Sequence, residues 1–491
     1  MGTLLWALGA ISSRFLGTLT LRTQPPRDHF VASLNSKAEI YYPGSEQFLN
    51  ASVRWSAAQT PQYDMIVKVS SEADVQKTIC FANENKRPFF TISGGHGTTT
   101  LINNITNGVG ILMHNMNNIT IVDNGSAALL EGGVFSGDLI SYLWSHGKQT
   151  MTTGCDCVGY IAPILGGGHG WLQGRYGLAS DQLISARMVL ANGTAITVSQ
   201  DSNPDLFWAI RGAGHNFGVV TQVKMKIYDR EPEQDQWATS GFVFTQDKLE
   251  QVFTIANGWL ESPKRPVELT QYGVFSFNPD IDPINPIFMM WIYWQGPAIP
   301  SKYTDPLNAL SPAAVDYSVT GLTSVNAHLQ ADRDGGACAE GFSRAMVPIS
   351  LTNYSLPALR KVLDIFTTLP TEFRTSIMLL EGYATNRVSE IPSEGSAFPD
   401  RDANLLLSPV LTWPKNASLD ATGWEIGGRI RRAALEGTDG KLEAYVNYAR
   451  GDESMEELYG YESWRLEKLR KLKKEFDPHG RFNFYAPILE D

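Results

Sequence analysis

Three clusters of glycine restrict what this chain can fold into, at residues 94–97, 166–170 and 212–218. Glycine adopts backbone conformations that other residues avoid, and it lets the backbone approach a ligand closely. The exposed N–H groups of such loops bind phosphates and other anions. Each cluster taken singly is more typical of a tight turn, so its meaning depends on the motifs around it.

The first cluster follows a strand, a helix and a second strand. The segment MIVKV predicts a strand, and SSEADVQKTICFANENKRP predicts a helix that Ser70 or Ser71 caps and Pro88 ends. PFFTI is the next strand, and SGGHG forms the loop at its end, a position that favours binding sites. Within this loop His96 has two readings: a histidine that caps a turn, or a neutral imidazole that acts as a nucleophile or cofactor ligand.

Several familiar sites are excluded by spacing. The run from Gly212 to Gly218 has the wrong spacing for a dinucleotide fingerprint and lies between a helix and a strand instead of the reverse. There is no Walker A run and no GxSxG motif. Four cysteines are too few for a disulfide framework, and Cys155 and Cys157 lack further ligands at zinc spacing. We therefore expect buried thiols and no metal.

Length and charge limit the partners. A chain of 491 residues is long for one hydrophobic core, which favours two domains or one domain with a large insertion. A net charge of -11 disfavours nucleic acid and anionic lipid surfaces. No apolar stretch approaches the roughly 18 residues of a membrane span. These features indicate a soluble globular protein and disfavour nucleic acid and membrane partners.

The cellular location is less well defined by the sequence. The start, MGTLLWALGAISSRFLG, has the apolar length of a signal peptide but no basic residue ahead of the apolar stretch. Asn-x-Ser/Thr triplets favour the secretory route over the cytoplasm. They begin at Asn50, Asn104, Asn118, Asn124, Asn192, Asn353 and Asn416.

The pattern of residue types changes between about residues 236 and 430. Amphipathic stretches such as LPALRKVLDIF alternate there with aromatic strands such as IFMMWIYW, which indicates a separate domain. Its aromatic residues Trp291, Tyr293 and Trp294 either line an apolar pocket or belong to the core. Glu381, in LLEGY, is expected to face solvent. The residues that follow 430 return to helix with ESWRLEKLRKLKKEF.

In their order along the chain the motifs are more specific than any one of them. SGGH, GCDCVG, GGGHG, YGLASDQ, NPDLFWAIRGAGHNFGVVT, YVNY and FDPHGRFNFYAPI resemble the FAD-linked oxidases of the vanillyl-alcohol-oxidase type, in the berberine-bridge-enzyme-like branch common among fungi. The resemblance implies an α+β fold. An FAD-binding domain formed by residues 1–235 and 431–491 would surround an inserted α+β substrate domain, residues 236–430, built on an antiparallel sheet.

The same resemblance implies a covalent cofactor. In this family the histidine of the GGH loop bonds to the 8α carbon of the flavin ring, and that histidine corresponds to His96. Cys155 occupies the position of a cysteine that often adds a second bond at flavin C6. The other residues that the resemblance places at the cofactor are Ser93, Gly94, Gly95, Gly97, Thr98, Gly154, Gly159, Gly166, Gly167, Gly168, Gly218, Val220 and Asn483.

Two departures from the family pattern affect the interpretation. An N-terminal Cys-Leu reads here as Ala32-Ser33-Leu34, so Cys80 loses the partner of a family disulfide. Some relatives carry a catalytic carboxylate or amide where this chain has Ser408 and Pro409. The expected base is therefore Tyr445, helped by Tyr448, and a tyrosinate requires a lowered pKa.

The resulting hypothesis is a monomeric oxidase that oxidises an alcohol or amine carbon. Hydride passes to flavin N5, and O2 reoxidises the flavin to give H2O2. The substrate would be a secondary metabolite or an oligosaccharide. Two alternatives stay open: a cyclase of secondary metabolism in which FAD is structural, and a binding protein without flavin.

Overall fold

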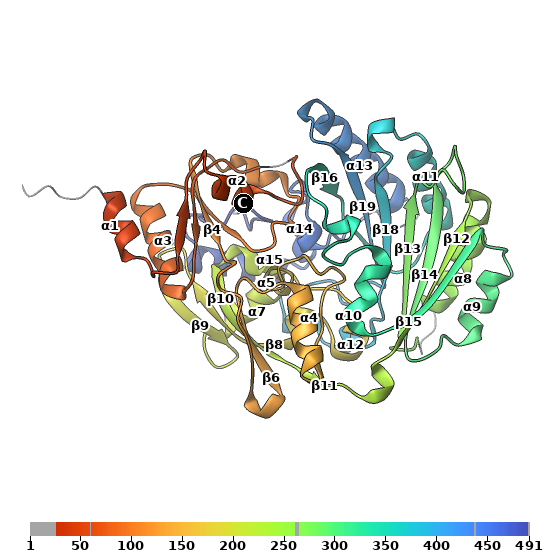
Figure 1. The fold of residues 1–491 in the computed structure, drawn as a ribbon, viewed down its shortest axis with the longest axis horizontal. Coiled ribbons are helices and arrows are strands. Elements are labelled where there is room, and N and C mark those ends of the chain that lie inside the picture. The colour runs from red at the N-terminus through yellow and green to blue at the C-terminus, as the bar shows by residue number, and fades with distance from the viewer. Residues whose placement is uncertain (1–25, 59, 261–264, 437, 490–491) are drawn as a thin grey trace, which may run out of the picture.

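A computed structural model describes residues 26–58, 60–260, 265–436 and 438–489. Figure 1 shows the N-terminal part of the chain on one side of the molecule and a large sheet on the other. The possible signal peptide lies outside the described residues. In the described part of the chain, none of the helices combines the length and apolar character that a bilayer crossing needs.

Two sheets form the N-terminal half. One has the order β1-β2-β4-β3, with β2, β4 and β3 parallel, and the other is antiparallel with the order β5-β6-β10-β8-β9. β7 and β11 pair in a separate two-stranded ribbon. The bounds are β1 (Glu39–Tyr41), β2 (Tyr63–Lys68), β3 (Phe89–Ile92), β4 (Gly108–Leu112), β5 (Ile119–Val122), β6 (Ala127–Glu131), β7 (Lys148–Gln149), β8 (Leu183–Val189), β9 (Ala195–Ser199), β10 (Val219–Lys226) and β11 (Tyr228–Asp229).

Short helices connect and cover these strands. The predicted helix before PFFTI is confirmed: Ser71 caps it by accepting a hydrogen bond from the backbone N–H of Asp74 at 3.2 Å, and its stripe of Val75, Ile79 and Ala82 is buried. The helices are α1 (Pro26–Ser33), α2 (Glu46–Ser52), α3 (Glu72–Glu84), α4 (Ser136–Ser145), α5 (Ile161–Leu165), α6 (Gln173–Tyr176) and α7 (Pro204–Ala213).

The inserted part is built on an eight-stranded antiparallel sheet with the order β15-β12-β14-β13-β18-β19-β16, in which β17 also pairs with β19. Helices α8, α9, α11 and α13 lie along its outer side (Figure 1). The bounds are β12 (Trp237–Phe244), α8 (Leu249–Leu260), β13 (Leu269–Ser276), β14 (Ile287–Gln295), α9 (Ser301–Asn308), β15 (Ala314–Thr320), α10 (Leu322–Val325), β16 (Phe342–Met346), β17 (Ile349–Leu351), α11 (Leu356–Thr367), β18 (Ile377–Gly382), α12 (Asn386–Glu390), β19 (Leu405–Pro414) and α13 (Asp420–Leu435).

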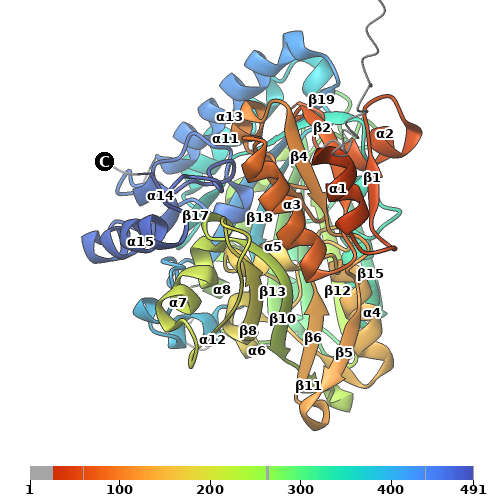
Figure 2. The same cartoon turned by 90° about the vertical axis from the view of Figure 1, so that its left-hand side faces the viewer.

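The tail returns to the N-terminal half. Its helix α15 (Ser463–Phe476) lies beside α7, and α14 (Met455–Tyr459) packs on α15 (Figure 2). Lys473 donates a hydrogen bond to the carbonyl oxygen of Asn216 at 3.1 Å, and Arg481 donates to that of Arg87 at 2.6 Å. The predicted α+β fold, with a substrate domain inserted into a two-part domain, is confirmed. The domain limits at residues 235 and 430 stay predictions.

A buried ion pair joins the two halves. Arg401, in the loop before β19, makes a bidentate contact with Asp181, which follows α6, at 2.7 and 2.9 Å. The two side chains are only 3% and 5% exposed. Because both charges are shielded from water, each is stabilised mainly by the other, and removal of one leaves the other buried without an opposite charge.

We predict that Asp181→Asn lowers the free energy of unfolding by about 3–5 kcal/mol, because it leaves the Arg401 charge buried without a partner. Urea unfolding of the full chain measures the change. Glu436→Gln is the control, since its pair with Lys361 is half exposed and surface pairs contribute little. Equal losses in the two variants would contradict the prediction.

Candidate active site

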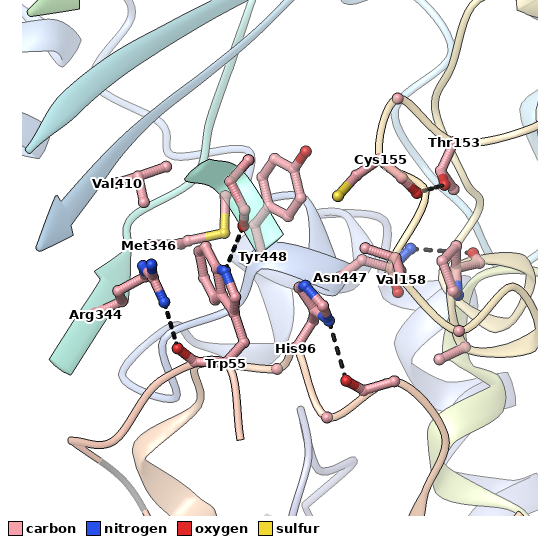
Figure 3. A pocket seen from close by; sticks show the side chains of 18 of the residues that line it. Trp55, His96, Thr153, Cys155, Val158, Arg344, Met346, Val410, Asn447 and Tyr448 are labelled. Carbon is pink, nitrogen blue, oxygen red and sulfur yellow. Dashed lines mark hydrogen bonds between the residues drawn. The ribbon is translucent and has the colours of Figure 1, made fainter. Parts of the chain in front are cut away.

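A cavity of about 970 Å³ lies between the N-terminal half, the tail and the large sheet. Its walls come from the end of β3 and the loop after it, from residues 153–159, from the tail residues 445–448 and 481–485, and from one face of β13, β14 and β18. Figure 3 shows side chains from these separate segments turned toward the same space. The volume is at the upper end of the range for small-molecule sites.

Two backbone loops approach closely at one wall. A Cβ atom on Gly94 would lie 2.5 Å from the backbone nitrogen of Gly159, and Gly95 has φ +68°, which favours glycine. The loop that holds His96 therefore packs directly on the loop that holds Cys155. Glycine at these positions is a packing requirement.

The imidazole of His96 faces the cavity and stacks on Trp55, with ring centroids 5.4 Å apart. Its Nδ1 donates a hydrogen bond to the carbonyl oxygen of Gly94 at 3.1 Å. Burial lowers the pKa of His96 to about 4, so the ring is neutral near pH 7 and Nε2 carries a free lone pair. The reading of this histidine as a turn cap is confirmed by its bond to Gly94. Its role as a nucleophile or cofactor ligand stays a prediction.

Three of the four cysteines gather beside His96. Cys157 forms a disulfide with Cys338, so the expectation that the cysteines are all thiols is wrong. The pairing partner is 181 residues away in sequence, which is why spacing did not indicate it. Cys155 is a free thiol on the cavity wall, and burial raises its pKa to about 12. Cys80 is also free, as expected from the loss of its family partner.

The disulfide also bears on metal binding. Ligand atoms of His96, Cys155 and Cys157 lie within 4.8 Å of one another. Because the disulfide removes the Cys157 thiolate, only two ligands of this group are left, fewer than a structural zinc site requires.

Two buried arginines on the wall fit an anionic ligand. Arg54 is 7% exposed and Arg344 is 4% exposed, and among the described residues no carboxylate pairs with either. Arg54 donates to the carbonyl oxygen of Gly97 at 2.7 Å, within the first glycine cluster. Burial lowers the pKa of both guanidinium groups. A buried cation without an anionic partner is costly, so a bound phosphate group would relieve it.

Most of the residues that the resemblance places at the cofactor line this cavity. They are Ser93, Gly94, Gly95, His96, Gly97, Gly154, Cys155, Gly159, Gly218 and Val220. The wall that the described residues form does not include Thr98, Gly166, Gly167, Gly168 or Asn483.

Those five residues lie close behind the wall. Thr98 Oγ1 and Asn483 Oδ1 are buried without a hydrogen-bond partner among the described residues. A Cβ on Gly166 would meet the side chain of Asn447, and a Cβ on Gly167 would meet Phe398. The lack of a side chain at these glycines lets the wall-forming segments pack together.

A buried carboxyl group that sequence reasoning missed lies on the large sheet. Glu381 of β18 is 3% exposed and lines the cavity, so the expectation that it faces solvent is wrong. It accepts hydrogen bonds from the hydroxyl groups of Tyr383 at 2.9 Å and Tyr448 at 3.0 Å. Tyr272 lies directly opposite it on β13. Glu381 and Tyr383 are two residues apart in LLEGY, but only strand pairing and the returning tail complete the cluster.

The environment of Glu381 gives it the properties of a general base. Burial raises its pKa to about 7, while the tyrosine hydroxyl groups partly oppose that rise. A carboxyl group with this pKa exchanges protons readily near neutral pH. The three tyrosines around it have pKa values well above 10, mainly because they are buried.

Tyr445 has a different environment from the one that the sequence suggested. It belongs to the short segment before the 3-10 helix Val446–Tyr448, and its hydroxyl oxygen accepts hydrogen bonds from Asn447 at 2.7 Å and from the backbone N–H of His169 at 3.3 Å. Burial raises its pKa to about 12. The pKa of Tyr445 is thus raised, whereas a tyrosinate base requires a lowered one. Its assignment as the base stays a prediction.

The histidines of the second and third glycine clusters hold the tail in place. His169 is also bonded to Gln173 at 2.9 Å, and His215 donates to Asn447 at 3.1 Å. Both line the cavity. Both loop histidines are thus held by side-chain hydrogen bonds.

The aromatic residues of β14 divide between the two expected roles. Trp291 lines the cavity, whereas Tyr293 is fully buried and Trp294 packs on Tyr303. The remaining wall formed by the sheet is largely aliphatic. It includes Val274, Met289, Met346, Ile377, Leu379 and Val410.

Comparison with known proteins agrees with this geometry. Residues 63–199 match the family described as "FAD binding domain", and residues 444–488 match "Berberine and berberine like". The FAD-linked oxidoreductase chyH of Penicillium rubens is 36% identical over 98% of this chain and 98% of its own length. The chain belongs to the berberine-bridge-like FAD-linked oxidoreductases.

Solved structures of this FAD-linked oxidoreductase fold extend over nearly the whole chain. Physcomitrella patens BBE-like 1 covers 94% of this chain and 99% of its own, with a TM-score of 0.81 and 20% identity. The glucooligosaccharide oxidase of Acremonium strictum, which carries a 6-S-cysteinyl, 8α-N1-histidyl FAD, covers 95% of this chain and 99% of its own, with a TM-score of 0.78 and 18% identity. At these identities the likeness shows the fold.

The cavity of this FAD-linked oxidoreductase fits its cofactor. Arg54 and the glycine loop offer a cation and N–H groups to the diphosphate of FAD, and His96 and Cys155 lie farther along the same wall. Glu381 and Trp291 lie on the part of the wall that the large sheet forms.

We predict that turnover rises with pH through about 7, because Glu381 is protonated below its raised pKa and is a carboxylate above it. Glu381→Gln should remove this rise and lower kcat by about 10²–10⁴-fold, the usual contribution of a general base. Steady-state rates between pH 5 and 9 measure both effects. An unchanged pH profile in the variant would show that another group accepts the proton.

Proposed function

We propose that this protein is an FAD-dependent oxidase that oxidises an alcohol or amine carbon of a small, largely apolar molecule and transfers the electrons to O2. The observation that carries the proposal is Glu381, a buried carboxyl group with a pKa of about 7 on the wall of the cofactor cavity. Oxidation of an alcohol or amine requires a group that accepts the hydroxyl or amine proton.

The wall around Glu381 favours an apolar substrate over an oligosaccharide. The aliphatic residues of β13, β14 and β18 offer no hydrogen bonds to sugar hydroxyl groups, whereas they pack well on a hydrocarbon or aromatic skeleton. Trp291 adds a flat surface for an aromatic ring. A secondary metabolite with one oxidisable carbon fits this wall best.

Residues from the tail and from the inserted sheet position the reacting group and accept its proton. Bound FAD would supply the hydride acceptor and the reaction with O2. Tyr448 reaches the substrate side and passes a proton to Glu381 through their 3.0 Å hydrogen bond. Tyr445, fixed by Asn447 and by the backbone of His169, orients the substrate hydroxyl or amine group. The surrounding wall excludes water.

We further propose that the cofactor is bound covalently through His96 and Cys155. The neutral imidazole of His96 and the free thiol of Cys155 both face the cavity. Histidine and cysteine are also the two residue types that attach FAD in the glucooligosaccharide oxidase of Acremonium strictum.

A secretory location is also part of the proposal. The disulfide between Cys157 and Cys338 suits an oxidising compartment. All seven acceptor asparagines are exposed, which glycosylation requires. They are Asn50, Asn104, Asn118, Asn124, Asn192, Asn353 and Asn416.

The double variant His96→Ala/Cys155→Ser is expected to release its flavin completely on acid precipitation, because it lacks both attachment atoms. Each single variant should retain part of the flavin in the pellet, and the absorbance of pellet and supernatant measures the partition. His146→Ala, changed at an exposed helix end, is the control. Complete release from the unmodified protein would refute covalent binding.

A screen of apolar alcohols and amines against oligosaccharides tests the reaction. We expect substrate-dependent H2O2 from the apolar class, measured with a peroxidase-coupled dye. Tyr445→Phe should reduce kcat less than Tyr448→Phe, since of these two tyrosines Tyr448 is the one that donates a hydrogen bond to Glu381. Product formation without H2O2 would favour a cyclase in which FAD is structural.

A further inference from the structure

Two sulfur atoms beside His96, Sγ of Cys155 and Sγ of Cys157, are candidates for the same bond to the cofactor. Cys155 Sγ lies 3.5 Å from Cys157 Sγ and 3.8 Å from Cys338 Sγ, and Cys157 Sγ lies 3.4 Å from Nε2 of His96. With both thiols free, Cys155 and Cys157 would each be close enough to the attachment histidine to react with the same ring. The disulfide removes one of the two.

Cys338 reaches this position on a segment from the inserted domain. Residues 326–339, which we call the strap, cross the cavity and contribute Leu329, Gln330 and Ala337 to its wall. Hydrogen bonds hold the strap independently of the disulfide. Trp55 Nε1 donates to the carbonyl oxygen of Ala337 at 2.7 Å, and the backbone N–H of Asp156 donates to that of Ala331 at 2.9 Å.

The side chain of Asp156 makes a second contact with the strap. It accepts a hydrogen bond from Asn326 at 2.7 Å. Asp156 lies between the two competing cysteines, so the strap is aligned with the CxC segment through both its backbone and its side-chain groups. The structure thereby presents Cys338 to Cys157 and leaves Cys155 facing the cavity.

We propose that the Cys157–Cys338 disulfide selects the sulfur that bonds to the cofactor, by masking Cys157 and reserving Cys155. This inference depends on the covalent attachment proposed above. In the attachment step an S–H and a ring C–H bond are lost and an S–C bond forms. The two electrons and two protons released pass to O2, which becomes H2O2.

The Cys157–Cys338 disulfide is also protected from thiol–disulfide exchange with Cys155. A thiol attacks a disulfide only as its thiolate. Since burial raises the pKa of Cys155 to about 12, that thiol is protonated near neutral pH and seldom attacks the adjacent disulfide. Exchange between Cys155 and the disulfide is therefore slow.

Peptide mass mapping of the full-length protein and its variants, with alkylation of free thiols, tests the selection. In the unmodified protein we expect flavin on His96 and Cys155 and no alkylation of Cys157 or Cys338. Cys155→Ser should lose the sulfur link. Cys155→Ser/Cys338→Ser should regain a sulfur link, now on Cys157, because the mask is gone.

Further variants separate the possible outcomes. Cys338→Ser alone should give a mixture of Cys155 and Cys157 links, and Cys157→Ser/Cys338→Ser should give Cys155 only, which controls for loss of the disulfide itself. Cys80→Ser, remote from the cavity, should match the unmodified protein.

Two results would contradict the proposed selection by the Cys157–Cys338 disulfide and leave the proposed covalent attachment intact. These are a Cys157 link in Cys155→Ser, or an exclusive Cys155 link in Cys338→Ser. If the unmodified protein has no sulfur link to the flavin, attachment through Cys155 is refuted. The proposed selection by the disulfide is then refuted as well.

Discussion

The contact between the backbones of Gly94 and Gly159 is the constraint on which the site depends. The loop that holds Gly94 follows β3, and the loop that holds Gly159 follows the CxC segment. Their contact therefore brings His96 and Cys155 to one wall. A side chain at either glycine would separate the loops. Arg54, on the wall beside it, donates to the same glycine loop at Gly97.

The second organising feature is a buried charge that three parts of the chain share. Glu381 comes from the inserted sheet, Tyr272 from the strand paired with it, and Tyr448 from the tail. Burial alone would keep the carboxyl group protonated, and the hydrogen bonds from tyrosine partly restore its acidity. The balance places its pKa where proton transfer is easy, and it also fastens the tail to the substrate domain.

The Cys157–Cys338 disulfide is a second connection between the N-terminal half and the inserted part. It ties the strap of the inserted domain to the loop that carries Cys155, the proposed attachment residue. The cofactor loops and the substrate wall are thus coupled by one covalent bond and by a hydrogen-bonded carboxyl group.

The sequence by itself determined the local elements, the family and the positions of His96 and Cys155, because capping, periodicity and glycine motifs depend on neighbouring residues. Only the tertiary structure decided the surroundings of Glu381, Cys157 and Tyr445. Burial is set by the segments that pack around a side chain, and those lie far away in sequence: Cys338 is 181 residues from its partner. A pKa or a disulfide depends on that packing, so neither could be read from spacing.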